Sequence, residues 1–219
     1  MTPVISLITN RDRDAGGADR LVERVRWAAG AGVHLVQVRE RDLDGGPLTS
    51  LVRRCVEAVR GSQARVLVND RVDVALAAGA HGVHLRAASM PASRVRRLSP
   101  PGFLIGRSVH SRDEAVTVCE GGGLDYLLFG TVFATSSKPG RTPAGPQALA
   151  ELVAAAPVPV LAVGGVSPDN LGKVAAAGAA GFAAIGLFVA SSEAALAQAV
   201  AASTAAFTAT LERRDDHDI

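Results

Sequence analysis

The sequence has few aromatic residues, almost no net charge and no long hydrophobic run. Aromatic side chains make up 4% of the 219 residues, whereas hydrophobic residues make up 48%. The core is therefore expected to consist of alanine, valine and leucine, which suits close packing of helices on a sheet. The formal net charge is +2, which does not indicate a nucleic-acid-binding surface. No segment approaches the ~18 uninterrupted apolar residues of a membrane span, so neither nucleic acid nor membrane is an expected partner.

The two cysteines, Cys55 and Cys119, lie in apolar, helix-like contexts and do not have CxxC spacing. We expect both to be reduced and packed, not to form a disulfide or a metal site. The N-terminal segment MTPVISLITNRDRD has no charged region followed by a long apolar run, which indicates a cytoplasmic protein.

Short strands follow glycine-terminated helices several times along the chain. AAGAGV at 28–33, AAGAHGV at 77–83 and AAGAAGF at 176–182 each precede an apolar run, and 120–125 is a looser copy. Glycine accepts the left-handed conformation that ends a helix, and continuous apolar runs are typical of strands buried on both faces. Eight strands are predicted at 4–9, 33–38, 65–69, 82–85, 103–107, 125–130, 158–163 and 181–185. Eight helices are predicted at 17–30, 47–60, 71–79, 91–98, 111–121, 145–155, 168–177 and 192–211.

Eight alternating units predict an α/β protein with a single (β/α)8 TIM-barrel domain over residues 1–211 and a polar tail over 212–219. A doubly wound open sheet is the alternative, but no GxGxxG motif follows the first strand.

In a (β/α)8 barrel the active site lies at the carboxyl ends of the strands. The residues expected there form a polar ring with basic members: Thr9, Asn10, Gln37, Arg39, Glu40, Arg41, Asn69, Asp70, His84, Arg86, Ser108, His110, Gly130, Thr131, Gly164, Gly165, Ile185 and Gly186.

The last two strand ends indicate a phosphate site. Gly164 and Gly165 follow the seventh strand just before a helix start at Ser167, and Ile185 and Gly186 follow the eighth. Glycine lets backbone N–H groups approach an anion, and a helix N-terminus adds a favourable dipole. Each glycine alone could be an ordinary turn residue, but two such loops together favour phosphate.

Gln37, Arg39 and Arg41 alternate along the second strand and should point the same way. Guanidinium groups aimed at the barrel mouth suit bidentate phosphate binding. A surface salt-bridge cluster with Asp42 and Asp44 fits the spacing equally well.

Asn69 and Asp70 could bind Mg²⁺, or Asp70 could cap the helix at 71–79. His84 lies between apolar residues, which favours a packed, hydrogen-bonded histidine. His110 could act as an acid–base group or only form its loop.

Several motifs together resemble the thiamine-phosphate synthase/TenI superfamily over nearly the whole chain. They are QVRER (37–41), LVNDRVDVALAAGAHGVHL (67–85), IGRSVHSRDEA (105–115), YLLFGTVFATSSKPG (126–140) and VLAVGGVSPDN (160–170). The resemblance implies a (β/α)8 barrel with one of two activities. Synthases join a hydroxymethylpyrimidine pyrophosphate to a thiazole phosphate with Mg²⁺, whereas TenI-type tautomerases aromatise a thiazole phosphate carboxylate by metal-free proton transfer.

The sequence departs from the synthase pattern at three positions, and at one of them it also departs from the TenI pattern. Arg41 stands where synthases have lysine, Ser89 where they have a second Mg²⁺-binding aspartate, and Thr131 where they have proline. Thr131 is also the position of the proposed TenI histidine. Since Ser89 removes a negative charge from the metal site, we expect a TenI-like tautomerase that needs no cofactor. The alternatives are a synthase that uses Mg²⁺ and a non-catalytic binder of thiamine precursors.

The resemblance also implies a phosphorylated thiazole as ligand and a homo-oligomeric state. The candidate catalytic residues are His110 and Thr131, and Asp70 is the candidate metal ligand. The expected substrate-binding residues are Gln37, Arg39, Arg41, Asn69, Ser108, Thr135, Ser137 and Lys138, and the expected phosphate-binding residues are Gly164, Gly165, Ile185 and Gly186.

Overall fold

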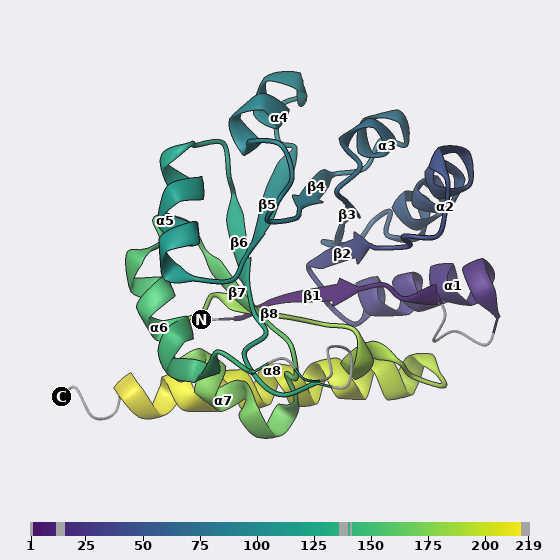
Figure 1. Ribbon diagram of the computed structural model, residues 1–219. Coiled ribbons are helices and arrows are strands. Elements are labelled where there is room, and N and C mark those ends of the chain that lie inside the picture. The colour runs from purple at the N-terminus through teal and green to yellow at the C-terminus, as the bar shows by residue number, and fades with distance from the viewer. Residues whose placement is uncertain (1, 12–15, 136–139, 141, 216–219) are drawn as a thin grey trace.

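Eight parallel strands form a closed barrel in the order β1 to β8, with β1 paired to β8 (Figure 1). The computed structural model describes residues 2–11, 16–135, 140 and 142–215. The strands are β1 (Val4–Ile8), β2 (Leu35–Val38), β3 (Arg65–Asn69), β4 (Gly82–Leu85), β5 (Leu104–Val109), β6 (Tyr126–Phe129), β7 (Val160–Val163) and β8 (Gly181–Ala184). The predicted (β/α)8 barrel is confirmed, and the open-sheet alternative is wrong.

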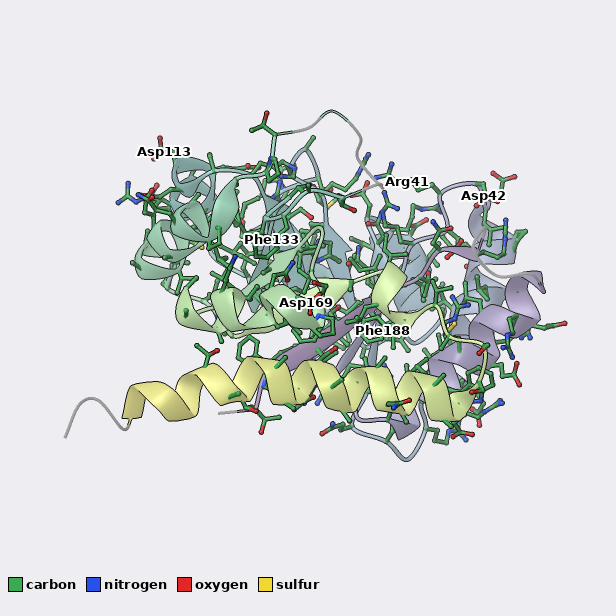
Figure 2. The ribbon with its side chains drawn as sticks, turned by 90° about the horizontal axis from the view of Figure 1, so that it is seen from below. Arg41, Asp42, Asp113, Phe133, Asp169 and Phe188 are labelled. Carbon is green, nitrogen blue, oxygen red and sulfur yellow. The ribbon has the colours of Figure 1, made fainter. Side chains whose placement is uncertain are left out.

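A helix follows every strand. The helices are α1 (Gly17–Gly30), α2 (Gly45–Ala58), α3 (Val72–Ala77), α4 (Ala92–Leu98), α5 (Arg112–Glu120), α6 (Gly145–Ala155), α7 (Pro168–Ala176) and α8 (Glu193–Asp215), with a short 3₁₀ turn η2 (Gly186–Phe188) before α8. The long helix α8 runs beside α7 in both views (Figures 1 and 2). It ends four residues later than predicted, inside the segment expected to be a tail. No described helix is both long and apolar enough to cross a membrane.

Local sequence signals define where helices α5 and α7 begin. The Ser111 hydroxyl accepts a hydrogen bond from the backbone N–H of Glu114 at 3.2 Å, which caps α5. Helix α7 begins at Pro168, and the N–H of Ser167 just before it donates to Oδ1 of Asn170 at 2.9 Å.

The core has two parts, one between the sheet and the helices and one inside the barrel. The inner part consists of Ile8, Leu35, Leu67, Tyr126, Leu128, Leu161 and Ala183. Gly106 makes room for the largest of these side chains, because a Cβ at Gly106 would lie 2.0 Å from the Tyr126 ring. The interior of the barrel is thus filled by side chains, and the open space lies at one end of the barrel.

The two-residue period of the strands positions the site above this inner core. Leu35, Leu67 and Gly106 point inward, so the residues two positions later on the same strands also point inward, but at the carboxyl end. These later residues are Gln37, Asn69 and Ser108.

Candidate active site

A cavity of about 500 Å³ lies at the carboxyl ends of the strands, where the fold predicts the active site. Every strand, or the loop that follows it, contributes to the lining. The described lining residues are Ile8, Asn10, Gln37, Arg39, Arg41, Asn69, Arg86, Ala87, Ala88, Ser108, His110, Leu128, Val163 and Ile185. The structure therefore brings together seven of the residues that were assigned a catalytic or binding role: Gln37, Arg39, Arg41, Asn69, Ser108, His110 and Ile185.

Three guanidinium groups line this cavity, those of Arg39, Arg41 and Arg86, and no described lining residue is an aspartate or glutamate. Burial, and then the neighbouring charge of Arg41, lowers the pKa of Arg39, which nevertheless stays positive at neutral pH. A cavity with this charge is suited to an anionic ligand.

The alternative of a surface salt-bridge cluster is wrong for these two arginines. Asp42 pairs instead with Arg11, and Figure 2 shows Asp42 at the outer edge of the molecule, beyond Arg41. Within the described part of the chain, the guanidinium groups of Arg39 and Arg41 form no ion pair or hydrogen bond, which leaves them available to a ligand.

Gln37 and Asn69 form a fixed pair of amides on the cavity wall. Nε2 of Gln37 donates to Oδ1 of Asn69 at 3.0 Å. This contact uses one donor of Gln37 and the acceptor of Asn69. It leaves the Gln37 oxygen as an acceptor and the Asn69 nitrogen as a donor, side by side.

Ser108 is held from inside the barrel by a buried hydrogen-bonded chain. Nε2 of His84 lies 2.8 Å from Ser108 Oγ, and Nδ1 of His84 lies 2.9 Å from the Tyr126 hydroxyl. Burial lowers the pKa of His84 to about 3 and raises the pKa of the Tyr126 hydroxyl, so both groups are neutral at physiological pH. The prediction that His84 is a packed, hydrogen-bonded histidine is confirmed.

His110 lies at the rim of the cavity in an orientation suited to accepting a proton. Its Nδ1 lies 2.6 Å from the carbonyl oxygen of Gly130. Since a carbonyl can only accept, Nδ1 carries a hydrogen, and Nε2 is the ring nitrogen that faces away from this contact. The backbone N–H of His110 donates to Glu114 at 2.7 Å, which fixes the loop.

Asp70 lines a neighbouring cavity of about 270 Å³ that shares Arg41, Asn69 and Arg86 with the larger one. The alternative of Asp70 as a helix cap is wrong, because α3 begins after Arg71 without a side-chain cap. The Asp70 carboxylate instead contacts two side chains of the β4–α4 loop. Its Oδ2 lies 2.5 Å from Nε of Arg86, and its Oδ1 accepts a hydrogen bond from Ser89.

These contacts do not fit a Mg²⁺ ion at Asp70. Mg²⁺ takes octahedral oxygen ligands, commonly from one or two carboxylates together with phosphates and waters. Each oxygen of Asp70 already has a partner, and the ion pair with Arg86 compensates its negative charge. The described residues also contain no group of three histidine, cysteine, aspartate or glutamate side chains that could hold a metal.

Thr131 is buried and is not among the described residues that line the cavity. It packs against the turn after β7, where a Cβ on Gly164 would lie 2.6 Å from Thr131 Cγ2. Gly165 has a φ of +64°, and a Cβ there would lie 2.3 Å from the carbonyl oxygen of Ala134. Both glycines thus have a steric role, because they let the segment after β6 lie directly on this turn.

The N–H groups of Gly165 and Gly186 donate to no backbone carbonyl of a described residue. Ile185 lines the cavity, whereas Gly164, Gly165, Gly186 and the half-buried Thr135 are not among its described lining residues. Ser137 and Lys138, which are predicted to bind substrate, lie outside the described residues.

Two arginines have roles that were not predicted from the sequence. Arg86 follows β4 in the expected polar ring, and its charge was the available signal, but no function was assigned to it. Arg107 is buried on β5, and its guanidinium donates to the carbonyl oxygens of Ala87, Ser89 and Met90 at 2.6, 2.8 and 3.0 Å. Neither hydropathy nor spacing indicates that a strand arginine organises a loop in this way.

Comparison with known proteins identifies the family of this chain. The family model described as thiamine monophosphate synthase (TMP-TENI) matches residues 5–188. A thiamine-phosphate synthase of Methanoculleus marisnigri is 41% identical over 179 residues, covering 81% of this chain and 84% of the relative. The thiamine-phosphate synthase of Chlorobium luteolum is 37% identical and covers 84% of each chain.

Two solved structures have the same fold. A thiamine phosphate pyrophosphorylase from Pyrococcus furiosus superposes with a TM-score of 0.81 at 30% identity, over 95% of this chain and 96% of the other. A 3-hexulose-6-phosphate synthase has a TM-score of 0.63 at 19% identity, over 93% and 99% of the two chains, and supports the fold alone. The match over residues 5–188 and these relatives show that the chain is an enzyme of the thiamine monophosphate synthase/TenI family.

Proposed function

We propose that this chain is a thiamine-phosphate synthase, which joins a hydroxymethylpyrimidine diphosphate to a thiazole phosphate and releases diphosphate. The observation that carries the proposal is the cavity with three arginines and no carboxylate among its described lining residues. A diphosphate leaving group carries several negative charges, and guanidinium groups fixed around it stabilise them as they develop. The names of the relatives at about 40% identity support the synthase over the tautomerase.

In the proposed reaction the bond between the pyrimidine methylene carbon and the diphosphate oxygen breaks first, and the electron pair leaves with the oxygen. Arg39, Arg41 and Arg86 neutralise the departing diphosphate. The thiazole nitrogen then donates its lone pair to the methylene carbon, which forms the new C–N bond. The chain's contribution is therefore orientation and charge stabilisation.

The amide pair on the cavity wall suits an aminopyrimidine ring. The free acceptor of Gln37 can receive a hydrogen bond from the exocyclic amine, and the free donor of Asn69 can reach the adjacent ring nitrogen. Ser108 supplies a further polar contact from β5, two strands away from Asn69.

We assign the thiazole phosphate to the turns after β7 and β8. The uncommitted N–H groups of Gly165 and Gly186 support this assignment, as does the start of the nine-residue helix α7 beside Gly165. Thr135, Ser137 and Lys138 remain predicted contacts of the same phosphorylated ligands. A homo-oligomeric state and a cytoplasmic location also remain predictions.

A TenI-type tautomerase is the second candidate, and the orientation of His110 favours it. An imidazole at the cavity rim whose Nδ1 is held by a backbone carbonyl presents Nε2 as the group that could remove a proton from a ligand carbon. The missing carboxylate at Ser89 is also compatible with this metal-free reaction. The third alternative, a non-catalytic binder, receives no support from membership of an enzyme family.

One experiment separates these functions. The purified protein is incubated with the pyrimidine diphosphate and thiazole phosphate, and thiamine phosphate is measured by mass spectrometry. A parallel sample contains the thiazole carboxylate tautomer, and its aromatisation is followed by absorbance. A synthase would form thiamine phosphate in the first sample and would not aromatise the tautomer in the second. The His110→Gln variant should form thiamine phosphate at an only modestly lower rate. Aromatisation without condensation, abolished by His110→Gln, would replace the synthase proposal with the tautomerase, and no turnover in either sample would contradict both.

A further inference from the structure

Asp70, Arg86 and Ser89 form a closed set of contacts at the edge of the cavity. Nε of Arg86 lies 2.5 Å from Asp70 Oδ2, and the hydroxyl of Ser89 donates to Asp70 Oδ1. The backbone N–H of Arg86 in turn donates to Ser89 Oγ at 2.9 Å. The carboxylate charge is thus matched by a guanidinium of the same chain.

The loop that carries Arg86 and Ser89 is held in place by hydrogen bonds from a residue of strand β5. The buried Arg107 donates to three carbonyl oxygens of this loop, at Ala87, Ser89 and Met90. Charge-assisted hydrogen bonds of this kind are stronger than neutral ones. The backbone path of the loop that carries Arg86 is therefore fixed by the chain itself.

Arg86 has donors left for an anion after it binds Asp70. Its Nε makes the ion pair with the carboxylate, and the two terminal nitrogens of its guanidinium form no hydrogen bond with a described residue. The side chain is 57% exposed and lines the larger cavity together with Arg39 and Arg41. The ion pair with Asp70 thereby orients the planar guanidinium group of Arg86.

We propose that this chain binds the diphosphate of its substrate through the guanidinium of Arg86, which takes the place of a divalent cation at Asp70. In this arrangement Arg86 supplies one positive charge and hydrogen-bond donors where Mg²⁺ would bring two charges, and Ser89 completes the support of Asp70. Diphosphate binding then needs no Mg²⁺. The inference rests on the proposed synthase function for the identity of the ligand but concerns only how that ligand is held.

Calorimetric titration with inorganic pyrophosphate tests the inference on the intact chain. The titration is run in the presence of a chelator and again with excess Mg²⁺. We expect pyrophosphate to bind in the chelator with an affinity at least equal to that in Mg²⁺. A titration with Mg²⁺ alone should give no binding heat.

Variants assign the effect to Arg86. Arg86→Gln should weaken pyrophosphate binding in the chelator about tenfold or more, because a bidentate charged contact is lost. Arg94→Gln is the matched control, since Arg94 is an exposed arginine on the neighbouring helix α4 and should leave the affinity unchanged. The double variant Arg86→Gln/Ser89→Asp exchanges the guanidinium for a second carboxylate and should bind pyrophosphate only when Mg²⁺ is present.

Binding of pyrophosphate by the unmodified protein only in Mg²⁺ would overturn the inference, whether or not the variants fold. Equal affinities of Arg86→Gln and the unmodified protein in the chelator would also overturn it. The condensation assay reports separately on the proposed function. Product that forms only with Mg²⁺ would contradict the inference and support the synthase, whereas metal-free pyrophosphate binding without any condensation would support the inference and contradict the synthase.

Discussion

His84 Nε2 lies 2.8 Å from Ser108 Oγ, which places a fully buried imidazole directly beneath a side chain that lines the cavity. The other ring nitrogen lies 2.9 Å from the Tyr126 hydroxyl. The buried Tyr126 hydroxyl needs an acceptor for its hydrogen, and Nδ1 of His84 provides it. Nε2–H then donates to Ser108, and the hydroxyl hydrogen of Ser108 is left for a ligand.

The first prediction concerns the inner end of this chain. Tyr126→Phe removes the hydroxyl and leaves Nδ1 of His84 buried without a partner. We expect the free energy of unfolding to fall by about 1–3 kcal/mol and kcat/KM to fall as the orientation of Ser108 is lost. Urea unfolding and steady-state kinetics measure the two effects.

Thr117→Val is the control for this variant. It also removes a hydroxyl, but at an exposed position on α5, where Oγ1 bonds only to the carbonyl oxygen of Asp113. The free energy of unfolding should then change by less than ~0.5 kcal/mol. If Tyr126→Phe matches Thr117→Val in both stability and kcat/KM, the buried chain does not position Ser108.

The second prediction is a pH dependence of stability that originates in His84. Burial lowers its pKa in the folded state from 6.5 to about 3, so between these pH values the unfolded chain binds a proton that the folded chain does not. The contribution of His84 to stability is therefore complete above about pH 6.5 and is lost as the pH falls toward 3, with a slope of up to about 1.4 kcal/mol per pH unit. Urea unfolding at a series of pH values from 7 downward measures this slope.

The comparison variant is His84→Gln, which does not titrate in this range. Burial also lowers the pKa values of His34 and His81, so the unmodified protein has contributions from three histidines. The difference in slope between the two proteins isolates His84. Equal slopes below pH 6.5 would show that His84 takes up a proton in the folded state, contrary to its burial between Tyr126 and Ser108.

Much of the fold could be predicted from the sequence because it depends on local patterns. Apolar runs of four to six residues located all eight strands, and small residues followed by glycine located the helix ends. The bounds predicted for 17–30 and 145–155 agree with α1 and α6. The C-terminal end of α8 was missed, since polar residues continue the helix to Asp215 without a terminating glycine.

The candidate site was less predictable where it depends on contacts between distant loops. Strand alternation was sufficient to place Gln37, Arg39 and Asn69 on the cavity wall. In contrast, the engagement of Asp70 by Arg86 depends on the path of the β4–α4 loop, which is fixed by a strand arginine 21 residues after Arg86. Such a path is a tertiary property that neither periodicity nor spacing encodes.

The third prediction concerns that strand arginine. Arg107→Lys keeps the charge but cannot donate to three loop carbonyls from a planar group. We expect faster amide hydrogen exchange over residues 86–90 and weaker pyrophosphate binding. Arg97→Lys, at an exposed position on α4, should change neither. Unchanged exchange in this segment would mean that the loop holds its path without Arg107.

The last prediction separates two reasons for glycine at the turn after β7. Gly165 and Gly79 have nearly the same left-handed φ, +64° and +68°, but an added Cβ would lie 2.3 Å from the carbonyl oxygen of Ala134 at Gly165 and has open space at Gly79. Gly79→Ala should therefore cost about 1–2 kcal/mol of stability from backbone strain alone. Gly165→Ala should cost a further ~1–3 kcal/mol from the collision and also lower kcat/KM, because the segment after β6 must move off the turn. Equal losses of stability in the two variants would show that this close approach contributes nothing to the fold.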